Sequence, residues 1–123
     1  MTQTRSTAEW QALGREHLLA PFSDYKQLGA KGARIVTRAD GVYLWDSEGQ
    51  KILDAMAGLW CVNVGYGRRE LADAAHRQML ELPYYNLFFQ TAHPPAIELA
   101  AAIAELAPAG MSHVFFAGSG SEA

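Results

Sequence analysis

Several kinds of site are excluded by what this 123-residue sequence lacks. Its single cysteine, Cys61, has no partner for an internal disulfide, and one thiol is too few for a zinc site. The four histidines are scattered without ligand spacing, so we expect no metal site. No lysine or arginine follows Arg77 and the net charge is −3, which excludes the basic stripe of a nucleic-acid-binding protein.

Long hydrophobic runs are also missing. No apolar stretch approaches the ~20 residues that cross a bilayer, so we expect no membrane association. Residues 1–20 are too polar for a signal or transit peptide, and we therefore expect a cytoplasmic protein. Half of the residues are hydrophobic and 19% are charged, which is typical of a globular protein with a core.

The first half of the chain predicts a helix followed by a small antiparallel meander. A helix is expected over 7–19, with Ser6 or Thr7 as its N-cap and Pro21 just beyond its end. Residues 23–32 have the composition of a loop. Three strands are then expected, over 34–38, 42–46 and 51–54.

The second half alternates helices with glycine- and proline-bearing loops. Apolar residues share one face of a helix over 69–82, and a second helix is expected over 94–106, with apolar residues on both faces. An aromatic loop over 84–89 separates them, and a strand is expected over 113–116. This rhythm predicts an α/β fold in which most strands are parallel.

The residues that follow the last expected strand have the composition of an anion-binding turn. Small residues over 118–121 allow backbone N–H groups to approach a ligand, and a helix is expected to begin at Glu122. The hydroxyls of Ser119 and Ser121 add donors that suit a phosphate monoester.

Three other interpretations of the same turn stay open. The spacing Gly118-x-Gly120-x-x-Ala123 fits a relaxed dinucleotide-binding fingerprint. Ser119 and Glu122 have the spacing of a capping box, which is a purely structural device. A plain glycine-rich connection between strand and helix requires no ligand at all.

Several longer segments carry a family resemblance that covers nearly the whole chain. They occur in the order Asp54–Trp60, Val62–Gly67, Leu82–Asn86, Thr91–Pro94 and Val114–Ala123, after a helix with Trp10 and the segment His17–Asp24. Together they closely resemble the start of the class III pyridoxal-phosphate aminotransferases, in particular the ω-amine:pyruvate group. The combination is specific in a way that no single motif is.

The resemblance implies the amino-terminal part of a pyridoxal-phosphate enzyme of fold type I. Residues 1–58 would belong to the small domain, and residues 59–123 would begin the large cofactor-binding domain. The Schiff-base lysine, the aspartate that pairs with the pyridine and the ring-stacking aromatic residue would lie beyond Ala123. Lys26, Lys31 and Lys51 lie in polar surroundings before the turn, so we expect no catalytic residue here and no activity from this chain alone.

The resemblance also implies roles for individual residues. Ser119, Gly120 and Ser121 would bind the phosphate of pyridoxal 5′-phosphate. The substrate pocket would be lined by Trp60, Leu59, Phe22 and Phe88, part of the lining coming from a partner subunit. From spacing alone, a residue such as Trp60 more often packs in a core, and a ring cluster such as 84–89 more often lies in a core or an interface than in a pocket. Cys61 is expected to be a small buried hydrophobic residue.

The implied activity is transfer of an amino group from a primary amine or ω-amino acid to a keto acid such as pyruvate. The implied assembly is a homodimer or a dimer of dimers. One alternative is a non-catalytic module that binds a phosphate or a nucleotide. Another keeps the cofactor and the fold but carries out an aminomutase, racemase or decarboxylase reaction.

Overall fold

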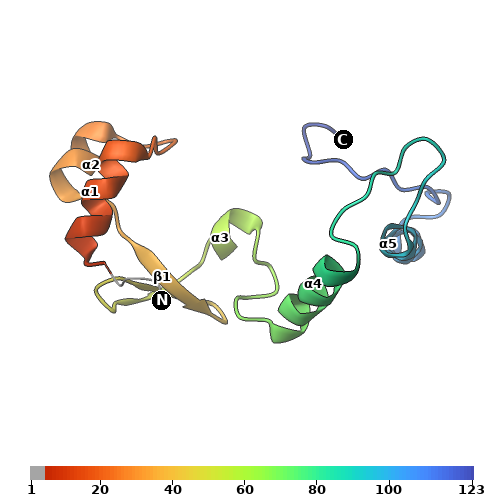
Figure 1. Ribbon diagram of the computed structural model, residues 1–123, viewed down its shortest axis with the longest axis horizontal. Helices are drawn as coiled ribbons and strands as arrows, with labels where there is room; N and C mark the ends of the chain where they lie inside the picture. The colour runs from red at the N-terminus through yellow and green to blue at the C-terminus, as the bar shows by residue number, and fades with distance from the viewer. Residues whose placement is uncertain (1–4) are drawn as a thin grey trace. The chain divides into compact units, whose positions relative to one another are not determined.

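The computed structural model describes residues 5–123 and divides into two compact units, one ending at Ala72 and the other running Asp73–Ala123. This division falls inside a helix, and the domain boundary expected after residue 58 stays a prediction. The elements among the described residues are α1 (Thr7–His17), α2 (Tyr25–Lys31), β1 (Val36–Asp40), β2 (Tyr43–Asp46), β3 (Lys51–Leu53), α3 (Ala57–Trp60), α4 (Arg69–Glu81) and α5 (Pro94–Leu106) (Figure 1).

Helix α1 begins where its capping residues place it. The Ser6 hydroxyl accepts the Glu9 N–H at 3.3 Å, and the Glu9 carboxylate accepts the Ser6 N–H at 2.8 Å. This reciprocal pair satisfies two N–H groups that a helix start otherwise leaves open. The hydrogen bonds from Ser6 also lower the pKa of Glu9. The predicted helix is confirmed, although it ends at His17, two residues before the expected Leu19.

The loop expected over 23–32 is wrong, because α2 occupies most of it. The Asp24 carboxylate accepts the N–H groups of Lys26 at 2.9 Å and Gln27 at 3.1 Å, which caps the helix. Gly32, at φ 75°, ends it. A seven-residue helix with an internal glycine is too short for a visible hydrophobic period, so the capping aspartate was the signal to follow.

The antiparallel meander is confirmed, with strand order β1-β2-β3. Tyr43 lies opposite both Asp40 on β1 and Leu53 on β3. The turn between β2 and β3 is closed by Asp46, whose carboxylate accepts the N–H groups of Glu48 at 3.1 Å and Gln50 at 2.9 Å. Asp46 is buried, with 7% of its surface exposed, and these hydrogen bonds satisfy it.

Both long helices of the second half are confirmed. α4 ends before Pro83, and α5 begins after His93 with proline in its first turn, where no N–H partner is needed. The strand expected over 113–116 is wrong: the only sheet among residues 5–123 is the meander. A strand needs a neighbour that accepts and donates ladder hydrogen bonds, and the apolar pattern of 113–116 does not provide one.

The residues that the structure describes contain no buried hydrophobic side chain. The large apolar residues of α5 are exposed, including Ile97 and Leu106, and only a face of alanines is half-buried, so the expected burial of both faces is not found within residues 5–123. Lys26, Lys31 and Lys51 are exposed as expected. None of the helices among the described residues has the length and apolar character needed to span a bilayer.

Candidate functional site

The glycine–serine turn at 118–122 is held by its glutamate. The Gly118 N–H donates to the Glu122 carboxylate at 2.8 Å, and the Glu122 N–H donates to the Ser119 carbonyl at 3.1 Å. Residues 120–122 form a turn, and the helix expected to begin at Glu122 stays a prediction, because only Glu122 and Ala123 of it lie in this sequence. The alternative interpretation as a capping box has no support in the hydrogen bonds, because the Glu122 carboxylate accepts from Gly118, one residue before Ser119, and the Ser119 hydroxyl accepts no N–H from within residues 5–123.

The donors of this turn fit a phosphate group. Within residues 5–123, the N–H groups of Ser119, Gly120 and Ser121 donate to no acceptor, and the two serine hydroxyls make no hydrogen bond. Their side chains are exposed. A Cβ added at Gly120 would meet nothing within 4 Å, so contacts among the described residues do not require glycine there.

The charges around the turn are compatible with a phosphate monoester. No lysine or arginine follows Arg77, so the donors of the turn are all neutral. They would not neutralise the negative charge of a bound phosphate. The Glu122 carboxylate is the nearby negative group, and it accepts its hydrogen bond from Gly118, outside the donors at 119–121. Neutral donors around an anion make charge-assisted hydrogen bonds, which are stronger than bonds between neutral groups.

The predicted wall residues Leu59 and Trp60 lie on a left-handed turn, α3. φ is positive at four successive residues: 48° at Ala57, 60° at Gly58, 62° at Leu59 and 66° at Trp60. The Trp60 N–H donates to the Met56 carbonyl at 2.9 Å, which closes the turn. Each non-glycine residue in this conformation costs about 1–2 kcal/mol, so other contacts must hold the segment.

The left-handed turn presents its large side chains outward. Trp60 is 81% exposed and Leu59 is also exposed. Cys61 is exposed as well, so the expectation of a buried hydrophobic cysteine is wrong.

Asp54 anchors this turn, and sequence reasoning missed it. Its carboxylate accepts the Tyr66 hydroxyl at 2.7 Å, the Gly58 N–H at 2.8 Å and the Met56 N–H at 3.2 Å. The hydrogen bond from Tyr66, followed by those from the backbone, lowers the pKa of Asp54, and the same bond raises the pKa of Tyr66. The available signal was an aspartate directly before a run of small residues, typical of side-chain capping of a turn.

Asp54 is expected to make stability depend on acid pH. Because its folded pKa is lowered, its contribution is fully present above the unfolded value of about 3.9 and is lost as pH falls through the folded pKa. Asp54→Asn should flatten that acid-side loss. Thermal unfolding of the whole protein and the variant, followed from about pH 2 to 7, checks it; identical acid slopes would contradict it.

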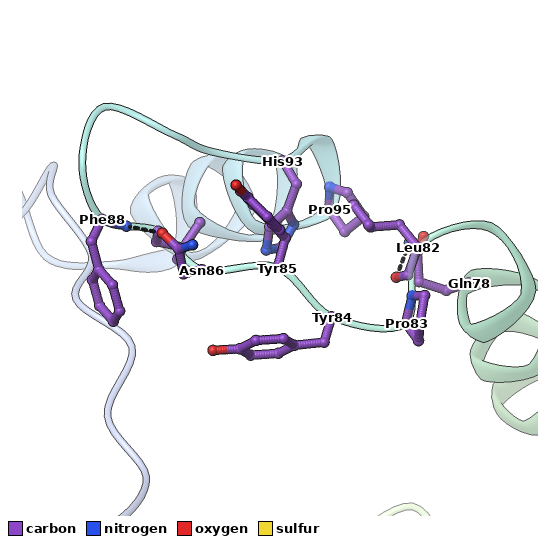
Figure 2. Close-up of a pocket in the computed structure, with 10 residues that line it drawn as sticks. Gln78, Leu82, Pro83, Tyr84, Tyr85, Asn86, Phe88, His93 and Pro95 are labelled. Atoms are coloured by element: carbon purple, nitrogen blue, oxygen red, sulfur yellow. Dashed lines mark hydrogen bonds between the residues drawn. The ribbon is translucent and has the colours of Figure 1, made fainter.

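The aromatic loop between α4 and α5 surrounds a cavity of about 400 Å³. Figure 2 shows Tyr84, Tyr85 and His93 around it, with Phe88 further along the loop than Tyr85. The Asn86 side-chain oxygen accepts the Phe88 N–H at 2.9 Å, which shapes the loop next to the predicted pocket residue. Phe88 is 64% exposed, and its ring meets that of Phe89 edge to face at 6.2 Å.

Phe22, the remaining predicted pocket residue, lies in the loop between α1 and α2. Its side chain is fully exposed and its φ is 53°. Within the described residues no ring contact joins it to Trp60. Of the predicted site residues, Leu59 and Trp60 lie together on one turn, and Ser119 and Ser121 lie together on another.

The comparisons with known proteins give these segments a common context. Residues 26–123 match the family described as aminotransferase class-III. This chain belongs to the class III aminotransferases. Its fold is the amino-terminal part of the fold of pyridoxal-phosphate-dependent transaminases, since it superimposes on an (S)-enantioselective omega-transaminase from Thermomicrobium roseum. The TM-score is 0.91 at 45% identity, over 98% of this chain and 27% of that one.

Named relatives of this class III aminotransferase chain are also similar. It is 77% identical over 117 residues to putrescine–pyruvate aminotransferase of Pseudomonas aeruginosa, covering 95% of this chain and 26% of that protein. It is 42% identical to beta-alanine–pyruvate aminotransferase of the same organism, covering 83% and 22%. An omega transaminase from Pseudomonas jessenii in complex with PMP gives a TM-score of 0.85 at 38% identity, covering 91% and 25%. The chain thus spans about a quarter of the length of these relatives.

Proposed function

We propose that the whole protein is a pyridoxal-phosphate-dependent aminotransferase. It transfers an amino group from a primary amine or ω-amino acid to a keto acid such as pyruvate. The observation that carries this proposal is the 77% identity to a putrescine–pyruvate aminotransferase along 95% of the chain. The similar proteins are aminotransferases by name, so the binding-module, mutase, racemase and decarboxylase alternatives have no support.

Ser119, Gly120 and Ser121 hold the cofactor phosphate in this proposal. Their N–H groups and hydroxyls are available, and Glu122 is occupied by Gly118. When bound, the cofactor supplies an electron sink at the carbon that carries the substrate's amino group. The turn anchors the phosphate, and that anchoring keeps the reacting end of the cofactor in place.

Trp60, Leu59, Phe22 and Phe88 line the amine pocket in this proposal. All four side chains are exposed in the described part of the chain, so they are free to form a surface for a substrate. One similar structure is a tryptophan-to-glycine variant of an omega transaminase, engineered for synthesis of enantiopure bulky amines. That result supports a tryptophan as the residue that limits amine size.

The proposed assembly is a cytoplasmic homodimer or dimer of dimers, with residues 1–58 in the small domain and 59–123 beginning the large one. The described residues leave apolar side chains such as Phe89, Leu106 and Phe115 uncovered. Exposed apolar surface of this kind is covered by other polypeptide, either the rest of the whole protein or a partner subunit.

A spectroscopic and kinetic experiment tests the proposal. The whole protein, purified with pyridoxal phosphate, should be yellow, and putrescine or β-alanine should bleach the colour. Addition of pyruvate should restore the colour and release alanine. Omitting the amine is the control. A colourless protein that does not take up added pyridoxal phosphate would overturn the proposal.

A further inference from the structure

The left-handed turn that carries Trp60 depends on contacts made from outside it. Ala57, Leu59 and Trp60 adopt positive φ values that residues with side chains rarely adopt. Within the turn, the Trp60 N–H donates to the Met56 carbonyl and the Cys61 N–H donates to the Ala57 carbonyl. Such bonds close the turn but do not fix its place relative to the meander.

A chain of hydrogen bonds ties the turn to the sheet. Asp54 accepts the Gly58 N–H at 2.8 Å and the Tyr66 hydroxyl at 2.7 Å. The Tyr66 backbone pairs with Gly41, next to β1, through N–H groups donated in both directions at 2.8 and 3.1 Å. Tyr66, six residues after Trp60, thus links Gly41 to Asp54, whose carboxylate holds the turn at Gly58.

Packing adds to these hydrogen bonds. A Cβ added at Gly58 would lie 3.0 Å from the Tyr66 hydroxyl oxygen and 2.9 Å from a Val62 methyl carbon. The Tyr66 hydroxyl thus rests directly against the turn while it bonds to Asp54. Movement of that hydroxyl would change both contacts at once.

We propose that Asp54 and Tyr66 are positioning residues that set the size limit for the amine, by holding Trp60 in the wall of the pocket. The inference rests on the proposed function and adds to it two residues outside the pocket lining. Asp54 and Tyr66 act through the backbone of Gly58 and do not contact the amine. Without the Tyr66 hydroxyl the turn relaxes, Trp60 moves, and larger amines gain access.

The test measures amine preference in the whole protein. The readout is the ratio of kcat/KM for a bulky amine, 1-phenylbutylamine, to that for putrescine, each with pyruvate. Tyr66→Phe, which removes only the hydroxyl, should raise the ratio about fivefold or more, in the direction of Trp60→Ala. Combined with Trp60→Ala it should add nothing, because the residue that it positions is gone. Tyr43→Phe is the matched control, since the Tyr43 hydroxyl has no hydrogen-bond partner within residues 5–123.

The outcomes separate this inference from the proposed function. If Tyr66→Phe lowers the Tm but leaves the ratio at the wild-type value, its role is structural and the inference is overturned. If Trp60→Ala also leaves the ratio unchanged, the pocket assignment fails and the inference fails with it. Wild-type protein that converts neither putrescine nor β-alanine overturns the proposed function itself. Should Tyr66→Phe not fold, Asp54→Asn carries the same test, because it weakens the bond from the other side.

Discussion

Replacing both Ser119 and Ser121 with alanine in the whole protein is expected to weaken binding of pyridoxal phosphate by about 10²–10⁴-fold. Each hydroxyl supplies a hydrogen bond to a charged group, worth about 1.5–3 kcal/mol. Two such bonds total about 3–6 kcal/mol, and every 1.4 kcal/mol corresponds to a factor of ten. No cation follows Arg77 in this chain, so its donors cannot compensate for the lost hydroxyls.

Titration of the apoprotein with pyridoxal phosphate, followed by absorbance, measures this effect. Ser112→Ala is the matched control, because the Ser112 hydroxyl bonds only to His113, at 3.1 Å, within the same unit. The control should bind cofactor like the wild type. A double variant with unchanged affinity would show that the turn does not grip the phosphate, whatever the activity of the enzyme.

Trp60→Ala is expected to raise the preference for bulky over small amines by about 10–200-fold. Size discrimination in an apolar pocket is worth about 1–3 kcal/mol per group, and the indole is the largest side chain among the predicted wall residues. Trp60 is 81% exposed, so the described residues do not use it as core.

Relative kcat/KM values for 1-phenylbutylamine and putrescine, with pyruvate as acceptor, check this prediction. Trp60→Phe provides a graded control, because it keeps a ring of smaller size at the same backbone position. It should fall between the wild type and Trp60→Ala. Equal loss of activity toward both amines would show that Trp60 supports the fold and does not select the substrate.

Much of the local structure could be predicted because its signals are short-range. The capping pair Ser6 and Glu9 marks the start of α1, and Pro83 marks the end of α4. The meander follows from alternating residues and polar turns. α2 was missed because its one strong signal, the capping side chain of Asp24, stands before a segment with the composition of a loop.

The candidate site was predictable in part, and by resemblance more than by spacing. Ser119 and Ser121 carry free donors as phosphate binding requires, but their role stays a prediction. The segment before them was expected to be a strand because of its apolar pattern. An apolar pattern records that a segment is suited to burial, and pairing requires a neighbouring strand that the pattern cannot specify.

The sequence by itself determined the positions of the capped and periodic helices, the three-stranded meander and the membership of the class III aminotransferases. Only the tertiary structure decided that residues 57–60 turn left-handed and that Asp54 and Tyr66 hold them. The physical reason is range. Helix caps and turns depend on neighbours within four residues, whereas a conformation that disfavours its own side chains persists only through contacts made across the fold.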